Sequence, residues 1–74
     1  MKNIETLIDE GGSFSIADLE KIGCVAAASD GHNCLAMLVR RKGESLSELM
    51  ARFDSAIGLA WSHDVFTDEV NDRD

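Results

Sequence analysis

Residues 45–62 read SLSELMARFDSAIGLAWS, and they carry the clearest secondary-structure signal in the chain. Ser45, followed three residues later by Glu48, is the capping-box pattern of a helix start. The apolar residues that follow recur on one helical stripe: Leu46, Leu49, Met50, Phe53, Ala56, Ile57, Ala60 and Trp61. Glu48 and Arg52 are spaced as an i, i+4 ion pair on the other face. We therefore expect one long amphipathic helix, with Leu59 off its stripe and facing solvent or a partner.

Two strand-like runs precede this helix, at residues 24–29 and 34–41, joined by Asp30-Gly31-His32-Asn33. Asp-Gly between two such runs is a strong hairpin signal, because a two-residue turn needs positive φ. The second run is apolar without alternation, so we expect both of its faces to be covered. The first run contains three alanines, which have low strand propensity but would let another element pack closely. A helix over residues 22–28 is the alternative.

The amino-terminal third contains two less certain segments. Residues 2–10 place three apolar side chains on one helical face, and a short edge strand fits them almost as well. Residues 15–22 are expected to form a short helix, since Ser15 and Asp18 match a capping box and Phe14 can staple against Leu19. Gly23 would then supply the left-handed residue after the helix end.

The predicted fold class is therefore α+β. An antiparallel hairpin packs against the long helix, with a third edge strand if residues 65–67 join the sheet, and a short helix lies near the amino terminus. Seventy-four residues suffice for one domain, 1–74, and residues 72–74 are expected to be a disordered tail.

Charge and composition limit the classes of function. Fourteen acids against seven bases give a net charge of −7, which opposes direct binding to nucleic acid or to an anionic membrane. Because no signal peptide or membrane-spanning run is present, we expect a cytoplasmic protein in which Cys24 and Cys34 stay reduced. No zinc-type spacing of Cys and His occurs, so no metal or other cofactor is predicted.

Two histidines are the remaining candidates for chemistry. His63 precedes Asp64 at the end of the long helix, where the dipole favours a positive ring. His32 lies in the hairpin turn beside Cys34, but no orienting third group is recognisable in the sequence. We expect no enzymatic activity; a small metal or hydrolytic site that uses His32 and His63 is the least favoured alternative.

Binding of a protein partner is the function that these observations favour. An acidic surface suits a basic partner, and the residues that we assign tentatively to such an interface are Asp64, Asp68, Glu69, Asp72, Leu59, Arg40 and Arg41. One helix can cover only one face of the hairpin, so a homodimer that covers the other face is also expected. A structural homodimer or assembly subunit without an inhibitory role is the main alternative.

Two resemblances point the same way. Residues 30–46 and 66–71 look like a group of small uncharacterised proteobacterial proteins often found near mobile elements, a group that implies no activity. Gly43-Glu44-Ser45-Leu46-Ser47-Glu48 after a hairpin is similar to the helix start of HicB-type antitoxins, which bind a small basic toxin. The chain lacks that family's Pro-rich strand link and a recognisable DNA-binding extension. Together with the charge and small size of the chain, the second resemblance favours an inhibitor or neutraliser of a basic, nucleic-acid-acting protein, such as a toxin or a defence nuclease complex.

Overall fold

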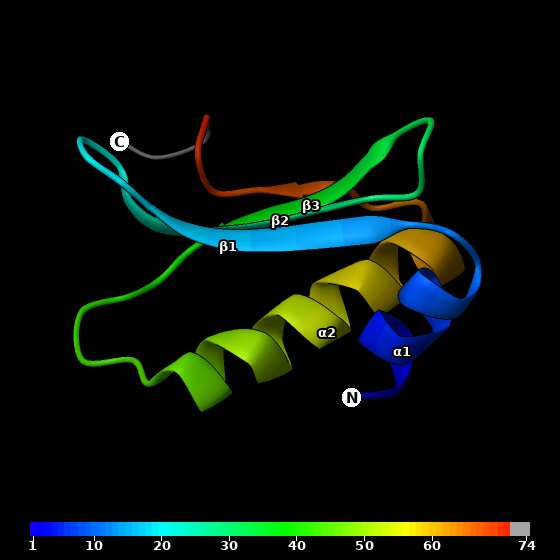
Figure 1. Cartoon of the computed structure of the whole chain (residues 1–74), viewed down its shortest axis with the longest axis horizontal. Helices are drawn as coiled ribbons and strands as arrows, with labels where there is room; N and C mark the ends of the chain where they lie inside the picture. The colour runs from blue at the N-terminus through cyan, green and yellow to red at the C-terminus, as the bar shows by residue number, and fades with distance from the viewer. Residues whose placement is uncertain (72–74) are drawn as a thin grey trace.

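The computed structural model describes residues 1–71 and confirms the α+β class (Figure 1). In chain order the elements are α1 (Lys2–Asp9), β1 (Ser13–Leu19), β2 (Gly23–Ser29), β3 (Cys34–Val39), α2 (Leu46–His63) and β4 (Thr67–Asp68). The sheet has the order β1-β2-β3-β4; its first three strands are antiparallel, and β4 runs parallel to β3. It is thus a four-stranded mixed sheet, whereas the sequence predicted two or three antiparallel strands.

The hairpin between β2 and β3 forms where Asp-Gly predicted it. Gly31 adopts a positive φ of 97°, which a residue with a Cβ disfavours. The Asp30 carboxylate accepts hydrogen bonds from the backbone N–H groups of His32 (2.8 Å) and Asn33 (2.7 Å), so the turn is held by its own side chain. The pairing register shifts between Ala28 and Ser29, and this bulge leaves Leu35 buried next to Ala36.

The helix predicted over residues 15–22 is wrong, because this segment forms β1 and the turn after it. Seven residues of β1 pair continuously with β2, from Ser13 opposite Ser29 to Leu19 opposite Gly23. Within β1, Phe14 and Ile16 are half-buried and Ser15 is exposed, which is the period of two of a strand. A full ladder of backbone hydrogen bonds outweighs a local capping pattern that occupies only two side chains.

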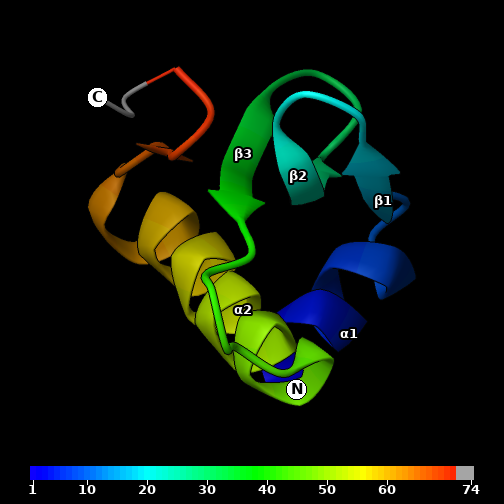
Figure 2. The same cartoon turned by 90° about the vertical axis from the view of Figure 1, so that its left-hand side faces the viewer.

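Both helices lie on the same face of the sheet (Figures 1 and 2). Residues 2–10, for which helix and strand fitted almost equally well, form α1. Its start has no side-chain cap of its own; instead the Asp54 carboxylate of α2 accepts from the backbone N–H of Ile4 (2.8 Å). The Asn3 side-chain amide donates to the backbone carbonyl of Asp54 (3.1 Å). Because Leu7 is also buried, both polar and apolar contacts hold α1 in place.

The core lies between the sheet and the two helices. It combines alanines and leucines of the sheet with mostly large side chains of the helices: Ile4, Leu7, Ala26, Ala28, Leu35, Ala36, Leu38, Leu49, Phe53, Ala56 and Ile57. Of the three alanines of β2, Ala26 and Ala28 are fully or almost fully buried in this core, whereas Ala27 points to the opposite face and is half-buried.

The predicted helix is present as α2, with Ser45 as its cap and the capping box complete. Two details of the prediction are wrong. Leu46 and Trp61 were placed on the buried stripe, but their exposed fractions are 50% and 41%. Glu48 does not pair with Arg52; its carboxylate accepts from the backbone N–H of Ser45 (2.8 Å), while Arg52 binds other carboxylates. Leu59 is exposed, as expected.

The opposite face of the sheet is not covered by either helix (Figure 2). The register aligns two rows across it, Ser15–Ala27–Met37 and Ala17–Val25–Val39. These rows alternate with the core-facing residues, so their side chains point away from the helices. Within β1–β3 these rows contain no charged residue, but the row through Met37 continues to Asp68 on β4. Val25 is buried, and Ala27, Met37 and Val39 are half-buried. The face without a helix is therefore apolar at its centre and polar at its edges.

Candidate functional site

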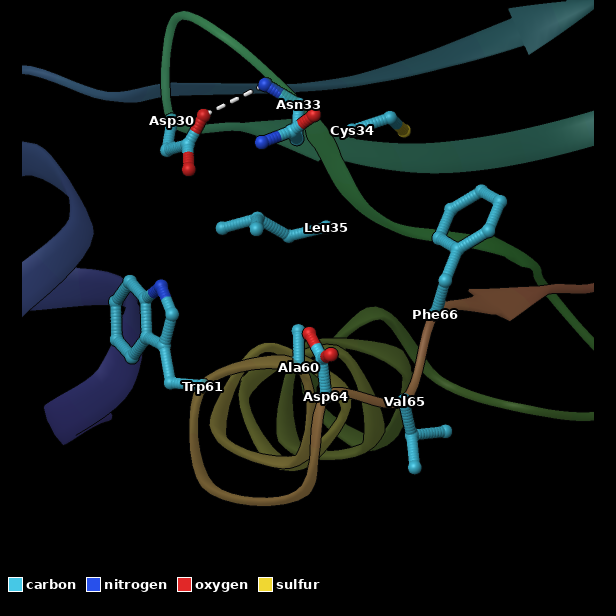
Figure 3. Close-up of a pocket in the computed structure, with 9 residues that line it drawn as sticks. All are labelled: Asp30, Asn33, Cys34, Leu35, Ala60, Trp61, Asp64, Val65 and Phe66. Atoms are coloured by element: carbon cyan, nitrogen blue, oxygen red, sulfur yellow. Dashed lines mark hydrogen bonds between the residues drawn. The ribbon is translucent and has the colours of Figure 1, made fainter.

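An open groove lies where the end of α2 approaches the turn between β2 and β3 (Figure 3). Its volume is about 580 Å³, within the range of about 300–1,000 Å³ that is usual for ligand pockets. Nine residues line it: Asp30, Asn33, Cys34, Leu35, Ala60, Trp61, Asp64, Val65 and Phe66. We call it the Trp61 groove. It combines aromatic side chains with two carboxylates.

The backbone at the end of α2 creates one wall of the groove. Asp64 ends the helix in the left-handed conformation, with φ 57° and ψ 34°, which Asp and Asn adopt more readily than most residues. The chain therefore leaves the helix axis abruptly and runs through Val65 and Phe66 toward β4. As a result Trp61 and Phe66 extend to opposite sides of the groove, and Asp64 lies at the helix end from which the chain turns (Figure 3).

The other wall is the hairpin turn, which presents Asp30. Backbone N–H groups of Asn33 and His32 donate to this carboxylate and lower its pKa below the ordinary value. Asp30 is therefore fully ionised at neutral pH. None of the nine lining residues is Lys, Arg or His, so the groove contains negative charge without a cation of its own.

Large apolar side chains at the groove are exposed to an unusual degree. The exposed fractions of Val65 and Phe66 are 44% and 50%, and Trp61 is comparable. Leu35 closes the floor and is buried. Exposed Trp and other aromatic residues are enriched at the centres of protein interfaces, whereas Asp and Glu are not, so the two carboxylates are a separate feature of this groove.

A different cluster occupies the far end of the sheet, around Arg52. Its guanidinium donates from Nε (2.7 Å) and Nη2 (3.0 Å) to the two carboxylate oxygens of Glu44, and from Nη1 to Glu69 (2.9 Å). Nη2 also donates to the backbone carbonyl of Val39 (3.0 Å). The Arg52 hydrogen bond, together with the backbone N–H of Arg41, lowers the pKa of Glu44 from 4.5 to about 2. These contacts join β3, the loop before α2 and the segment after β4.

The structure distributes the predicted interface residues over several places. Asp64 lines the Trp61 groove, whereas Leu59 lines a separate hollow beside Arg52 and Thr67. Asp68 accepts hydrogen bonds from the backbone of Val70 and Asn71, and from the Asn71 amide. Asn71 thereby lowers the pKa of Asp68.

The other predicted residues lie near the Arg52 cluster or outside the described chain. Glu69 binds Arg52 and accepts from the backbone N–H of Val39 (3.0 Å). Arg40 donates from Nε to the backbone carbonyl of Glu44 (2.7 Å), and Arg41 approaches Glu69 at 3.9 Å. Asp72, and with it the predicted disordered tail 72–74, lies outside the described residues. The six of these residues that the structure describes therefore do not form one site.

The alternative site with His32 and His63 is not assembled either. His32 is exposed in the hairpin turn, and the His63 ring bonds through Nδ1 to the hydroxyl of Ser62 (2.6 Å). Within residues 1–71, no group of three or more His, Cys, Asp or Glu side chains is arranged to hold a metal ion. The same part of the chain has no helix with the length and apolar character needed to cross a lipid bilayer.

Sequence patterns missed most of the Trp61 groove. Asp30 was assigned to turn formation and Trp61 to the buried stripe, while Phe66 was assigned to an edge strand or to a contact with the helix end. A usable signal was present, because two of the chain's four aromatic residues, Trp61 and Phe66, lie at and just after the end of the long helix. Comparison with protein-family models, curated proteins and solved structures finds no match to this chain. The chemistry of the groove is thus the basis for a functional proposal.

Proposed function

We propose that this chain is a non-enzymatic protein-binding module that holds a basic segment of a partner protein in the Trp61 groove. The observation that carries the proposal is the combination of exposed Trp61 and Phe66 with the carboxylates of Asp30 and Asp64, in a groove without a cation. Aromatic anchors supply contact area, and unbalanced negative charge favours a partner of opposite sign.

The charge of the whole chain supports the same partner class. Several of its acids are used internally: Glu48 caps α2, Asp54 caps α1, and Glu44 and Glu69 bind Arg52. Asp30 and Asp64 line the open groove (Figure 3), although one oxygen of Asp30 also accepts the hydrogen bonds that hold its turn. With a net charge of −7, the long-range field would also speed the encounter with a basic protein.

The specific form that we propose is a cytoplasmic inhibitor or neutraliser of a basic, nucleic-acid-acting protein, such as a toxin or a defence nuclease complex. A small acidic module that covers a basic surface competes directly with the phosphate backbone for that surface. The resemblance of residues 43–48 to HicB-type antitoxins and that of residues 30–46 to mobile-element proteins motivate this form.

Capture from a bacterial lysate at low salt, compared between two charge-matched variants, tests the proposal. Asp30→Asn/Asp64→Asn removes both groove charges, and Asn suits the left-handed turn at Asp64 as well as the capping role at Asp30. Asp18→Asn/Glu20→Gln removes two charges at the opposite end of the sheet. We expect the wild type and the second variant to retain the same basic protein, with about tenfold less retained by the groove variant. The recovered protein should lose nucleic-acid binding when this chain is added.

Two outcomes would contradict the proposal. If both variants lose capture equally, binding depends on the total charge of the chain and not on the groove. If no basic protein is retained, the partner is not a basic protein.

The uncovered face of the sheet supports a second candidate, a structural homodimer. The small side chains of Ala17 and Ala27 would let a second copy approach closely, and it would cover the half-buried Met37 and Val39. Sedimentation velocity over the micromolar range should reveal a dimer, and Ala27→Arg at the centre of the face should convert it to a monomer. Ser55→Arg, on the exposed side of α2, is the matched control. A wild-type chain that stays monomeric throughout would eliminate this candidate.

A further inference from the structure

We infer that the Trp61 groove recognises an arginine side chain of its partner, whose guanidinium pairs with the carboxylates that line the groove, Asp30 and Asp64, and packs against an exposed aromatic side chain at its wall. This inference rests on the proposed function and adds the chemical group that is recognised. It follows from the kinds of side chain that meet in the groove and from their relative placement (Figure 3).

The aromatic side chains favour a flat cation. Trp61 comes from α2 and Phe66 from the segment before β4, and they stand on opposite sides of the groove (Figure 3). An arginine guanidinium is planar and more weakly hydrated than an ammonium, so it stacks on aromatic rings at a smaller desolvation penalty. An extended apolar stem of the same side chain can contact Leu35, which is buried at the floor.

The carboxylates favour a donor with several N–H groups. Asp64 lines the groove from the end of α2, and Asp30 lines it from the hairpin turn (Figure 3). Asp30 is held in place by its hydrogen bonds to the turn, so its orientation is set before a ligand arrives. A guanidinium has five donors in a fixed fork and can serve two carboxylates at once, whereas an ammonium offers a point charge.

The chain contains two natural reporters of this site. Trp61 is its single tryptophan, so the fluorescence of the protein reports the groove directly. Cys34 lines the same groove and is exposed, whereas Cys24 lines a separate hollow formed with residues 40–45. Alkylation of Cys34, measured by mass spectrometry relative to Cys24, therefore reports occupancy with an internal control.

The experiment titrates the whole chain with the peptide Ac-Gly-Leu-Arg-Leu-Gly-NH2 and with versions that carry citrulline or lysine instead of arginine. Citrulline has nearly the shape of arginine without its charge. We expect the arginine peptide to change Trp61 fluorescence and to slow Cys34 alkylation but not Cys24 alkylation. Its affinity should exceed that of the citrulline peptide about tenfold and that of the lysine peptide about threefold.

The charge variants locate the interaction. Asp30→Asn/Asp64→Asn should abolish the preference for arginine over citrulline, and Asp18→Asn/Glu20→Gln should preserve it. Equal binding of the arginine and citrulline peptides would overturn the inference, as would an arginine preference that survives in the groove variant or no response at millimolar peptide. The capture experiment can still succeed in each of these cases, so failure here is separable from failure of the proposed function.

Discussion

Replacing Phe53 with alanine is expected to destabilise the fold by about 3–5 kcal/mol, the usual range for removal of a buried phenylalanine. Phe53 has no exposed surface and is the largest fully buried side chain. It belongs to the same cluster as Leu38 on the sheet and Leu49 on α2, and its ring contacts that of Phe14 at a centroid separation of 5.9 Å. The substitution would therefore leave a cavity at the centre of the core.

The loss expected for Phe53→Ala is large relative to the total free energy of unfolding of a chain of this length. A chain of 74 residues has a free energy of unfolding of about 4–11 kcal/mol, at about 0.05–0.15 kcal/mol per residue. Urea unfolding followed by far-ultraviolet circular dichroism should show that the Phe53→Ala variant is partly or fully unfolded in water. Ser55→Ala, on the exposed side of the same helix, should change stability by less than about 0.5 kcal/mol. Similar unfolding midpoints for the two variants would show that Phe53 is not central to the core.

The elements that were predictable from sequence carry strong local signals. The capping box at Ser45 and the Asp-Gly turn at Asp30 each determine backbone geometry within four residues, and both are present. The segment after Gly12 carries two conflicting local signals, because Ser15 and Asp18 suit a helix start while Phe14 and Ile16 alternate as in a strand. Pairing with a strand farther along the chain decides between helix and strand, and β2 pairs with β1 along its full length.

Periodicity predicted burial wrongly at the two ends of α2. Leu46 and Trp61 lie on the apolar stripe at these ends and stay exposed, while Leu49, Phe53 and Ile57 between them have no exposed surface. The period of a helix shows which of its faces is apolar, but not how much of its length other elements cover. Trp61 lines a groove together with the β2–β3 turn and the segment after α2, and no pattern within the helix itself can reveal this.

Removal of Arg52 is expected to cause the second largest loss of stability. Arg52→Met deletes the bonds to Glu44, Glu69 and the Val39 carbonyl and leaves two carboxylates without their cation. We expect the free energy of unfolding at neutral pH to fall by about 1–3 kcal/mol, because charge-assisted hydrogen bonds contribute more to stability than neutral ones. Chemical unfolding measures this, with Lys21→Met in the exposed turn between β1 and β2 as the control for removal of a cation.

The pH dependence of the unfolding free energy tests how much the bond between Glu44 and Arg52 contributes to stability. Its folded pKa of about 2 lies below its ordinary value of 4.5, so the folded state binds the proton more weakly than the unfolded chain does. The stabilisation is therefore fully present above about pH 5 and is lost as the pH falls from 4.5 toward 2. Glu44→Gln removes the titrating group. The difference in unfolding free energy between the wild type and this variant should be constant above about pH 5 and should shrink below pH 4.5. A difference that stays constant down to pH 2.5 would mean that the Glu44–Arg52 bond contributes nothing to the pH dependence of folding.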